Sequence, residues 1–414
     1  MAAIDGATRR DPRATRMGVI AFASHNLTTS CMFGSFGVAM TTVEQRLHVT
    51  REVSASAIPL VMLVAAVLGP VIGSVANRVS TRVLMLTGTL MAVAAFLVLA
   101  TTASVPAYLL AYALLLGPAM SLCGSIVPPI LVTRWFHKHR GRALGLVHMP
   151  VMMSVMPLLV ALVLRDHGLP FTYAMLAGIM ALNLIGVSLI IDAPRAEAEA
   201  IARVEAGEAP SWTTGALLTS GTFLVLALGL AAFTSTVVML GAHLVPMVTG
   251  FGISRTQAAG LQTLHGLAAM AGTPLLGWLA DKIGGRAAMA VLSINVAILL
   301  SLLLTQPAFP LLVVIVLLIG FHSGAIIACF GLAVSTRFGQ ANFGRAYGLG
   351  NLLTIPLMVG AVPLAAATYV RTGSYAMALM GHIGLLLAAA VLLLVGLGGK
   401  QGLLVPRRAR AVEA

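Results

Sequence analysis

The stretch TRWFHKHRGRALGL at residues 133–146 recurs as TRFGQANFGRAYGL at residues 336–349. Thr, Arg, Gly, Arg, Ala, Gly and Leu reappear in the same order and at the same spacing. A second pair of stretches, GSVANRVSTR at residues 73–82 and GWLADKIGGR at residues 277–286, is separated by almost the same length of chain. Two independent matches at nearly the same separation along the chain indicate an internal duplication, so the chain consists of one unit present twice.

The composition of the chain indicates that its natural solvent is lipid. Of its 414 residues, 59% are hydrophobic and only 9% are charged. Soluble domains carry about 25% charged residues, and a water-exposed surface cannot be covered with so few. The chain therefore reads as an integral membrane protein.

Apolar stretches long enough to cross a membrane as helices, which takes about 20 residues, occur throughout the chain. The expected spans are residues 17–40, 54–76, 83–101, 106–132, 143–164, 171–192, 216–246, 256–279, 287–305, 309–334, 346–370 and 375–397. The predicted fold class is all-α integral membrane: twelve transmembrane helices in two pseudo-symmetric six-helix bundles. The expected domains are an N-terminal bundle (1–192), a cytoplasmic linker (193–215) and a C-terminal bundle with a short cytoplasmic tail (216–414). The linker is too short for a catalytic domain, and its Glu199 and Arg203 are spaced for a surface helix.

The distribution of basic residues predicts the orientation. If the N-terminus is cytoplasmic, the 25 Lys and Arg residues all fall on the cytoplasmic side except Arg46, Arg51, Arg165, Arg255 and Arg371. Such an excess on one side follows the positive-inside rule. We expect a multi-pass protein of the cytoplasmic (inner) membrane with both termini in the cytoplasm.

Several classes of function are not supported by the sequence. The net charge of +13 is scattered in short clusters, which argues against nucleic acid as a partner. Cys31, Cys123 and Cys329 all lie in apolar runs without CxxC spacing, so neither a disulfide framework nor a metal site is expected. No phosphate-binding loop and no nucleophile–base pattern occur, and we expect no cofactor and no enzymatic activity.

The stretch GWLADKIGGR resembles the cytoplasmic loop motif of the major facilitator superfamily. Gly277, Leu279, Ala280, Asp281, Lys282, Gly284 and Arg286 fill that motif, and the first copy has Asn77 in place of the Asp. The TRWF…RGRALG stretch further resembles the monocarboxylate-porter and oxalate–formate-antiporter branch. The resemblance implies a monomeric secondary transporter whose spans one, four, seven and ten line a central cavity, with spans five and eight beside it.

The duplicated loops are the expected gate. Asp281 can bind a cationic side chain or the N-terminus of a neighbouring helix, and such contacts would hold one side closed until the halves rock. The alternative is that these basic residues only set topology. The candidate gating residues are Gly73, Asn77, Arg78, Arg82, Arg134, Arg142, Gly277, Asp281, Lys282, Gly284, Arg286, Arg337 and Arg345.

Histidine is the titratable residue left inside the spans, because no Asp, Glu, Lys or Arg lies well within one. Ionisable residues in a membrane are costly, and His titrates near physiological pH. The histidines within spans are His25, His148, His243, His265, His322 and His382, and each could also be a neutral residue packed between helices. The candidates for contact with substrate or proton are His25, Asn26, Thr29, Tyr112, Thr234, Thr236, His265 and His322.

Three hypotheses follow for the function. The first is a permease that moves a small organic solute, such as a monocarboxylate-like acid, by alternating access with proton coupling through His. The second is an exporter of lipophilic or drug-like compounds, suggested by apolar spans and 21 Met residues. The third, a receptor or enzyme on a transporter-like scaffold, is disfavoured because no segment outside the membrane can hold a domain. The expected partners are a small-molecule substrate, membrane lipid and protons.

Overall fold

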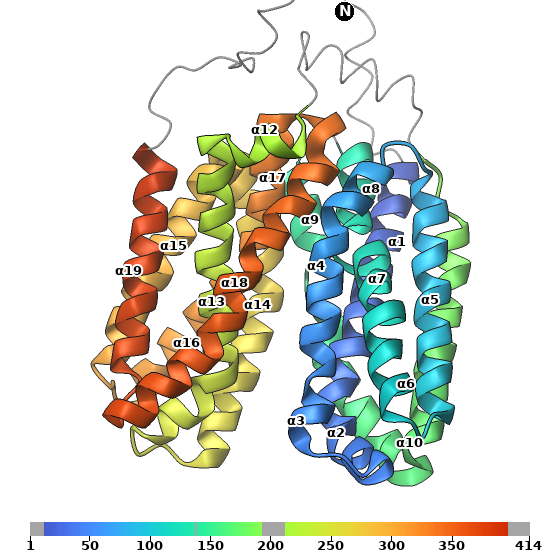
Figure 1. Ribbon diagram of the computed structural model, residues 1–414. Coiled ribbons are helices and arrows are strands. Elements are labelled where there is room, and N and C mark those ends of the chain that lie inside the picture. Colours follow the sequence, from blue (N-terminus) through green and yellow to red (C-terminus); the bar gives the residue numbers. More distant parts are fainter. Residues whose placement is uncertain (1–11, 137–138, 193–211, 396–414) are drawn as a thin grey trace, which may run out of the picture.

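The computed structural model describes residues 12–136, 139–192 and 212–395, and within these ranges all regular secondary structure is helical. The helices form two bundles that stand side by side (Figure 1). The start of α1 (Pro12–Thr29), helix α12 (Thr214–Leu218) and the end of α19 (Ala376–Val395) all lie at one end of the molecule, which we call the terminal face. The predicted surface helix around Glu199 and Arg203 lies outside the described residues.

The first bundle consists of α1 (Pro12–Thr29), η1 (Ser30–Gly34), α2 (Ser35–Leu47), α3 (Arg51–Ala55), α4 (Ala57–Val75), α5 (Thr81–Thr101), α6 (Val105–Leu110), η2 (Ala111–Leu116), α7 (Gly117–Ala119), η3 (Met120–Ser125), α8 (Val127–Trp135), α9 (Arg140–Val147) and α10 (Val151–Ser188). The second consists of α12 (Thr214–Leu218), α13 (Gly221–Thr249), α14 (Arg255–Ile283), α15 (Gly285–Leu304), α16 (Phe309–Ser323), α17 (Ile326–Phe338), α18 (Gln340–Thr372) and α19 (Ala376–Val395).

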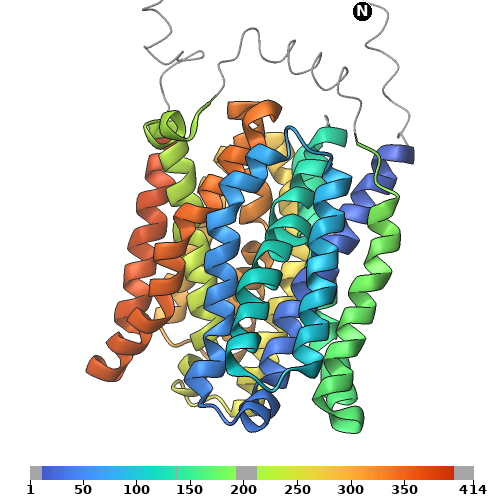
Figure 2. The ribbon, with the colours of Figure 1, turned by 45° about the vertical axis from the view of Figure 1, so that its right-hand side comes forward.

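The helices account for every expected span. Among the described residues, nine helical stretches are long and apolar enough to cross a membrane. One of them, Arg140–Ser188, contains Gly168 with the non-helical φ of 77°, and both of its ends lie near the terminal face, so it holds spans five and six. Spans one and eight are the more polar helices α1–α2 and α14. The prediction of an all-α fold with twelve spans is confirmed, and Figure 2 shows the long helices running between the two faces.

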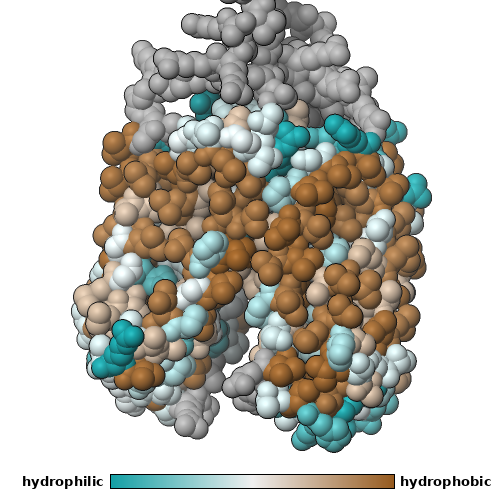
Figure 3. Space-filling view, viewed as in Figure 1, coloured by the Kyte–Doolittle hydropathy of each residue, from teal (hydrophilic) through white to brown (hydrophobic). Residues whose placement is uncertain are grey.

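The outer surface of both bundles is apolar. Leu158, Leu182 and Leu364 are each more than 60% exposed, as expected for side chains that face lipid. In Figure 3 hydrophobic residues cover most of the visible surface, and hydrophilic residues gather near both ends. The two bundles touch in the upper half of this view and separate in the lower half.

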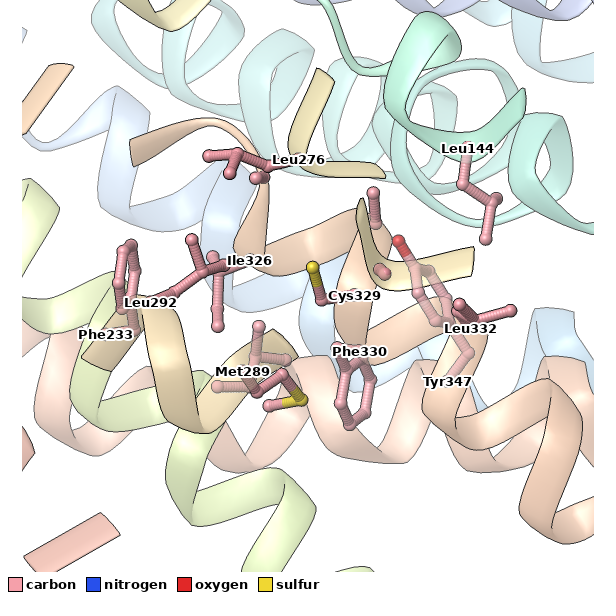
Figure 4. Packing of buried hydrophobic residues seen from close by; sticks show 14 of the residues in the cluster. Leu144, Phe233, Leu276, Met289, Leu292, Ile326, Cys329, Phe330, Leu332 and Tyr347 are labelled. Atoms are coloured by element: carbon pink, nitrogen blue, oxygen red, sulfur yellow. The ribbon is translucent and has the colours of Figure 1, made fainter. Parts of the chain in front are cut away.

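A buried apolar cluster joins the two bundles near the terminal face. Leu144 of α9 points toward Leu332 of α17 and Tyr347 of α18 (Figure 4). A separate cluster, which includes Met32, Phe96 and Tyr173, fills the first bundle. The residues of the first bundle that join this cluster lie in its terminal-face half, so the bundles are closed at the terminal face and apart at the opposite face.

One carboxylate fixes the last span of the first bundle to α5. Asp192 Oδ1 accepts a hydrogen bond of 2.9 Å from the Thr81 backbone N–H, and the hydroxyls of Ser80 and Thr81 also donate to Asp192. Burial alone would raise the pKa of Asp192, but these hydrogen bonds and the nearby Arg134 charge hold it below its ordinary value. Asp192 thus stabilises the N-terminus of α5 as an anion.

Candidate functional site

Two pairs of helices cross between the bundles at the terminal face, and glycines form both crossings. Helix α4 meets α18 where Gly69 and Gly73 face Gly348 and Gly344. A Cβ added to Gly344 would lie 2.5 Å from the carbonyl oxygen of Gly73, closer than any side chain tolerates. Only glycine permits this approach of two backbones, as in small-xxx-small contacts of other membrane helices.

The second crossing repeats the first with the roles of the bundles exchanged. Helix α9 of the first bundle meets α14 of the second, where Gly141 faces Gly277 and Gly145 faces Thr273. A Cβ on Gly277 would lie 2.5 Å from the Gly141 oxygen, and one on Gly145 would lie 2.6 Å from the Thr273 oxygen. The duplicated stretches are therefore the two sides of two equivalent interfaces.

Asp281 closes the second crossing with charge. Its two carboxylate oxygens accept hydrogen bonds from the backbone N–H groups of Gly141, at 2.6 Å, and Arg142, at 2.9 Å. These are free donors at the first turn of α9, where the helix dipole favours an anion. Of the two contacts expected for Asp281, the structure shows the one with a helix N-terminus.

At the corresponding place the first crossing has the neutral amide of Asn77 instead of a carboxylate. Asn77 Nδ2 donates to the Ala341 carbonyl at 2.7 Å, near the start of α18. Arg345 Nε donates to Ser74 Oγ at 3.1 Å, and one of its terminal nitrogens donates to the Trp212 carbonyl at 2.6 Å. Arg345 therefore links α4, α18 and the segment that precedes α12.

Two of the other candidate gating residues make side-chain hydrogen bonds within their own bundle. Arg134 donates to the Ala76 carbonyl at 2.6 Å, and Arg286 donates to the Leu394 carbonyl at 3.1 Å, each within its own bundle. Lys282 lies over the Trp278 ring. Gly284 has a φ of 87° and ends α14. Arg78, Arg82, Arg142 and Arg337 have exposed or half-buried side chains at the terminal face.

Four of the histidines within spans form two groups at helix interruptions. His25 Nδ1 donates to the Gly124 carbonyl at 2.7 Å, and its ring lies edge-on to that of His148, with centroids 4.8 Å apart. His148 ends α9, just before the break that Pro150 makes ahead of α10. This first group therefore lies between span one and span five, directly below the terminal-face contacts.

The second group lies where α16 and α17 are separated. His265 Nε2 is 3.1 Å from Ser323 Oγ, and Ser323 itself donates to the Ile319 carbonyl. The Ser323 oxygen is thus the acceptor, and His265 carries its proton on Nε2. His322 donates from Nδ1 to the Leu318 carbonyl at 2.7 Å, which leaves Nε2 to accept from Asn295 Nδ2 at 3.3 Å.

Asn26 and Thr29 are occupied by backbone contacts around the first group. Asn26 is 1% exposed, accepts from the Met152 N–H at 3.2 Å and reaches the Val147 carbonyl at 3.4 Å. Asn26 thereby gives hydrogen-bond partners to backbone groups that the break between α9 and α10 leaves without a helical partner. Thr29 donates to the His25 carbonyl at 2.7 Å.

The remaining candidates lie apart from both groups. Tyr112 is fully buried inside the first bundle, edge-on to Phe36. Thr236 is fully buried and donates to the Ala232 carbonyl, so its hydroxyl is occupied within its own helix. Thr234 Oγ1 is buried without a hydrogen-bond partner among the described residues, which leaves it available to a ligand.

The interrupted spans are themselves a feature of the site. Spans one and four contain π-helical turns (η1, η2, η3), and spans five and ten are broken at His148–Pro150 and near Gly324. Such turns leave backbone groups unpaired and occur often at functional sites, and broken helices form the midplane sites of transporters. Among the described residues, Asp, Glu, Lys and Arg lie only near helix ends or in connections.

The sequence of residues 23–361 matches the family profile of the Major Facilitator Superfamily. The chain belongs to this superfamily. Members are transporters rather than enzymes, so this protein is a multi-pass membrane transporter that acts on a small molecule.

Similar proteins include an uncharacterized MFS-type transporter, YcxA, of Bacillus subtilis (strain 168), with 24% identity over 380 residues and 88% of each chain covered. An MFS-type transporter of Gibberella moniliformis is 25% identical over 277 residues, or 64% of this chain and 63% of its own.

Solved structures show the same fold. The proton:xylose symporter XylE superposes with a TM-score of 0.70 at 14% identity, covering 92% of this chain and 95% of its own. The human organic anion transporter MFSD10 superposes with a TM-score of 0.68 at 15% identity, covering 92% of this chain and all of its own.

Proposed function

We propose that this protein is a secondary active transporter that moves a small organic solute across the cytoplasmic membrane by alternating access. The observation that carries the proposal is the asymmetry of its contacts. Two equivalent glycine crossings close the terminal face, while the bundles stand apart at the opposite face. Rocking of the bundles would open the first side and close the second around a fixed central site.

The terminal face is the cytoplasmic one in this proposal. Arg82, Arg142 and Arg345 belong to a large excess of basic residues at that face, whereas Arg46, Arg165 and Arg371 lie toward the other. The positive-inside rule supports this orientation, with both termini in the cytoplasm. The conformation described is then open to the outside, and its cytoplasmic gate is closed.

The substrate class follows from the charges that the interior lacks. A permanently charged solute would need a counter-charge when the site closes around it. Among the described residues a protonated histidine within a span, such as His25, His148, His265 or His322, could supply one, because the charged residues lie near helix ends. We therefore favour a neutral solute or a weak organic acid that moves together with a proton. The similarity in fold to a proton symporter and to an organic anion transporter is compatible with this class.

A second candidate function is export of lipophilic compounds. Met270 of the second bundle accepts a hydrogen bond from Ser154 of the first at 3.4 Å. Met152 and Met153 directly precede Ser154 in the chain. Methionine side chains adapt to apolar ligands of different shape. This observation favours a less selective, apolar substrate than the first proposal.

A ligand screen followed by flux measurement separates these proposals. Purified protein is heated with monocarboxylates, dicarboxylates, amino acids, sugars and lipophilic drugs at two pH values. A ligand at 100 times its dissociation constant stabilises the fold by about 2.7 kcal/mol. The first proposal expects a stabilising organic acid or neutral solute, whose uptake into proteoliposomes accelerates under an inward proton gradient. Stabilisation by bulky apolar compounds alone, with no effect of the gradient, would favour the exporter.

A further inference from the structure

His25 and His148 are held in a defined protonation pattern by backbone carbonyls. A carbonyl oxygen only accepts hydrogen bonds, so the proton of each neutral ring is on Nδ1, toward Gly124 and Leu144 respectively. Each ring then presents an unprotonated Nε2. That of His148 lies 3.4 Å from the hydroxyl of Tyr347, which donates to it. That of His25, on a half-buried side chain, has no hydrogen-bond partner among the described residues.

The pair has room for one added proton. With ring centroids 4.8 Å apart, an imidazolium on one side disfavours a second charge on the other. Its edge-on arrangement also places a cation against the face of a neutral ring, which is favourable. The pair therefore behaves as a single site that two rings share.

Among the described residues, no carboxylate lies beside the pair. The structure brings Tyr347 and the two rings together, and the other titratable groups within the described helices around them are Cys31, Cys123, His167, Tyr173, His265, Cys329 and Tyr369. Charged side chains of these helices lie at their ends: Arg13, Arg16, Arg134, Arg140, Arg142, Asp281, Lys282, Arg337 and Arg345 at the terminal face, and Arg165, Asp166 and Arg371 at the other.

Tyr347 belongs to the second bundle and lies within the gate. It sits on α18 between Gly344 and Gly348, both of which touch α4, and its ring stacks on Phe343. His148 ends α9, whose Gly141 and Gly145 form the other crossing. The contact from His148 to Tyr347 therefore spans the two bundles and breaks whenever the terminal face opens.

We propose that His25 and His148 form a one-proton site and that Tyr347 transmits its protonation to the terminal-face gate. This inference rests on the proposed alternating access and names its regulator. In the neutral pair, Tyr347 donates to His148 Nε2. When a proton binds there, Nε2–H donates to the Tyr347 oxygen instead, and this charge-assisted bond is about twice as strong. This gain is smaller than the cost of burying an imidazolium beside which no described carboxylate lies. Protonation therefore destabilises the closed terminal face and favours its opening, which exposes the imidazolium to water.

The test measures the gate directly and needs no substrate. Spin labels on Val83→Cys and Thr219→Cys, both exposed at the terminal face, report its opening by electron–electron distance measurements. The three native cysteines are buried and are not labelled. In the wild-type background, lowering the pH from 8 to 5.5 is expected to raise the ratio of open to closed protein about tenfold, with the dependence of a single proton that binds a hydrated imidazole.

Variants of the contact separate this account from a structural role. His148→Gln keeps a hydrogen-bonding side chain without a proton site and is expected to make the ratio independent of pH. Tyr347→Phe removes the hydrogen bond that spans the bundles and is expected to raise the ratio at both pH values. His25→Gln is expected to move the midpoint to lower pH. His382→Gln, whose ring bonds only the Ala378 carbonyl of its own helix, is the matched control and keeps the wild-type profile.

The outcomes distinguish this inference from the proposed function. A wild-type ratio that does not change with pH, or a His148→Gln protein that keeps the wild-type profile, would overturn the one-proton site while leaving alternating access standing. A protein that shows a single separation of the labels in every variant and at every pH would overturn both.

Discussion

Replacing Gly344 by Ala provides the most direct perturbation of the closed gate. The new Cβ would lie 2.5 Å from the Gly73 oxygen, 2.9 Å from its Cα and 3.0 Å from its carbonyl carbon. Ordinary contact requires about 1 Å more, and no side-chain rotation can supply it because every neighbouring atom is backbone. Overpacking of this kind costs about 1–3 kcal/mol.

This cost applies to only one of the two states. When the terminal face opens, α4 and α18 separate and the methyl group meets no backbone. A difference of about 2 kcal/mol then raises the ratio of open to closed protein about thirtyfold. The label pair at residues 83 and 219 measures that ratio.

Gly178→Ala is the matched control, because a Cβ at this helical glycine meets no atom within 4 Å. It is expected to leave the ratio unchanged. The reasoning would be refuted if Gly344→Ala lowered the melting temperature but left the ratio at the wild-type value, since the glycine crossing would then persist in both states.

Further substitutions test separate parts of the structure. Asp281→Asn removes the anion at the start of α9, and a loss of about 1 kcal/mol is expected to raise the open-to-closed ratio about fivefold in the same distance measurement. Gly272→Ala places a Cβ 2.8 Å from the Phe321 Cα within one bundle, so it should lower the melting temperature without changing that ratio; a changed ratio would contradict the rigid-bundle picture. Folding lowers the pKa of the Asp192 carboxyl, and Asp192→Asn removes this group. The carboxylate therefore contributes to stability above the ordinary Asp pKa, and this contribution is lost as the pH falls through the lowered pKa. The melting temperatures of Asp192→Asn and wild type should therefore differ at pH 7 and converge in acid, and a constant difference would argue against an ionised Asp192.

The gate could be predicted from the sequence because it is built from the duplicated stretches. The repeat pairs Gly141 with Gly344 and Gly145 with Gly348, and all four lie in the crossings between bundles. These positions need glycine because the two backbones touch there. The sequence alone does not show this contact, because it does not show which helices are partners.

The polar site was harder to predict because hydropathy does not show how a helix is rotated. Tyr112, a candidate for the cavity, is enclosed in the first bundle, and Asn26 is occupied by the break after α9. The sequence places His148 within a span but gives no sign of its contact with Tyr347, because that contact depends on the crossing of two helices far apart in sequence. The only local signal was Pro150, which predicts a helix interruption beside it.

The measurement that tests alternating access most directly follows both ends of one reconstituted molecule. Fluorophores at residues 83 and 219 report the terminal face, and a separate pair at the exposed residues 101 and 305 reports the opposite face. Single-molecule energy transfer in nanodiscs is expected to show two states, in which the first pair separates as the second pair approaches. A terminal-face distance that never changes, or that changes while the opposite face stays open, would contradict the account.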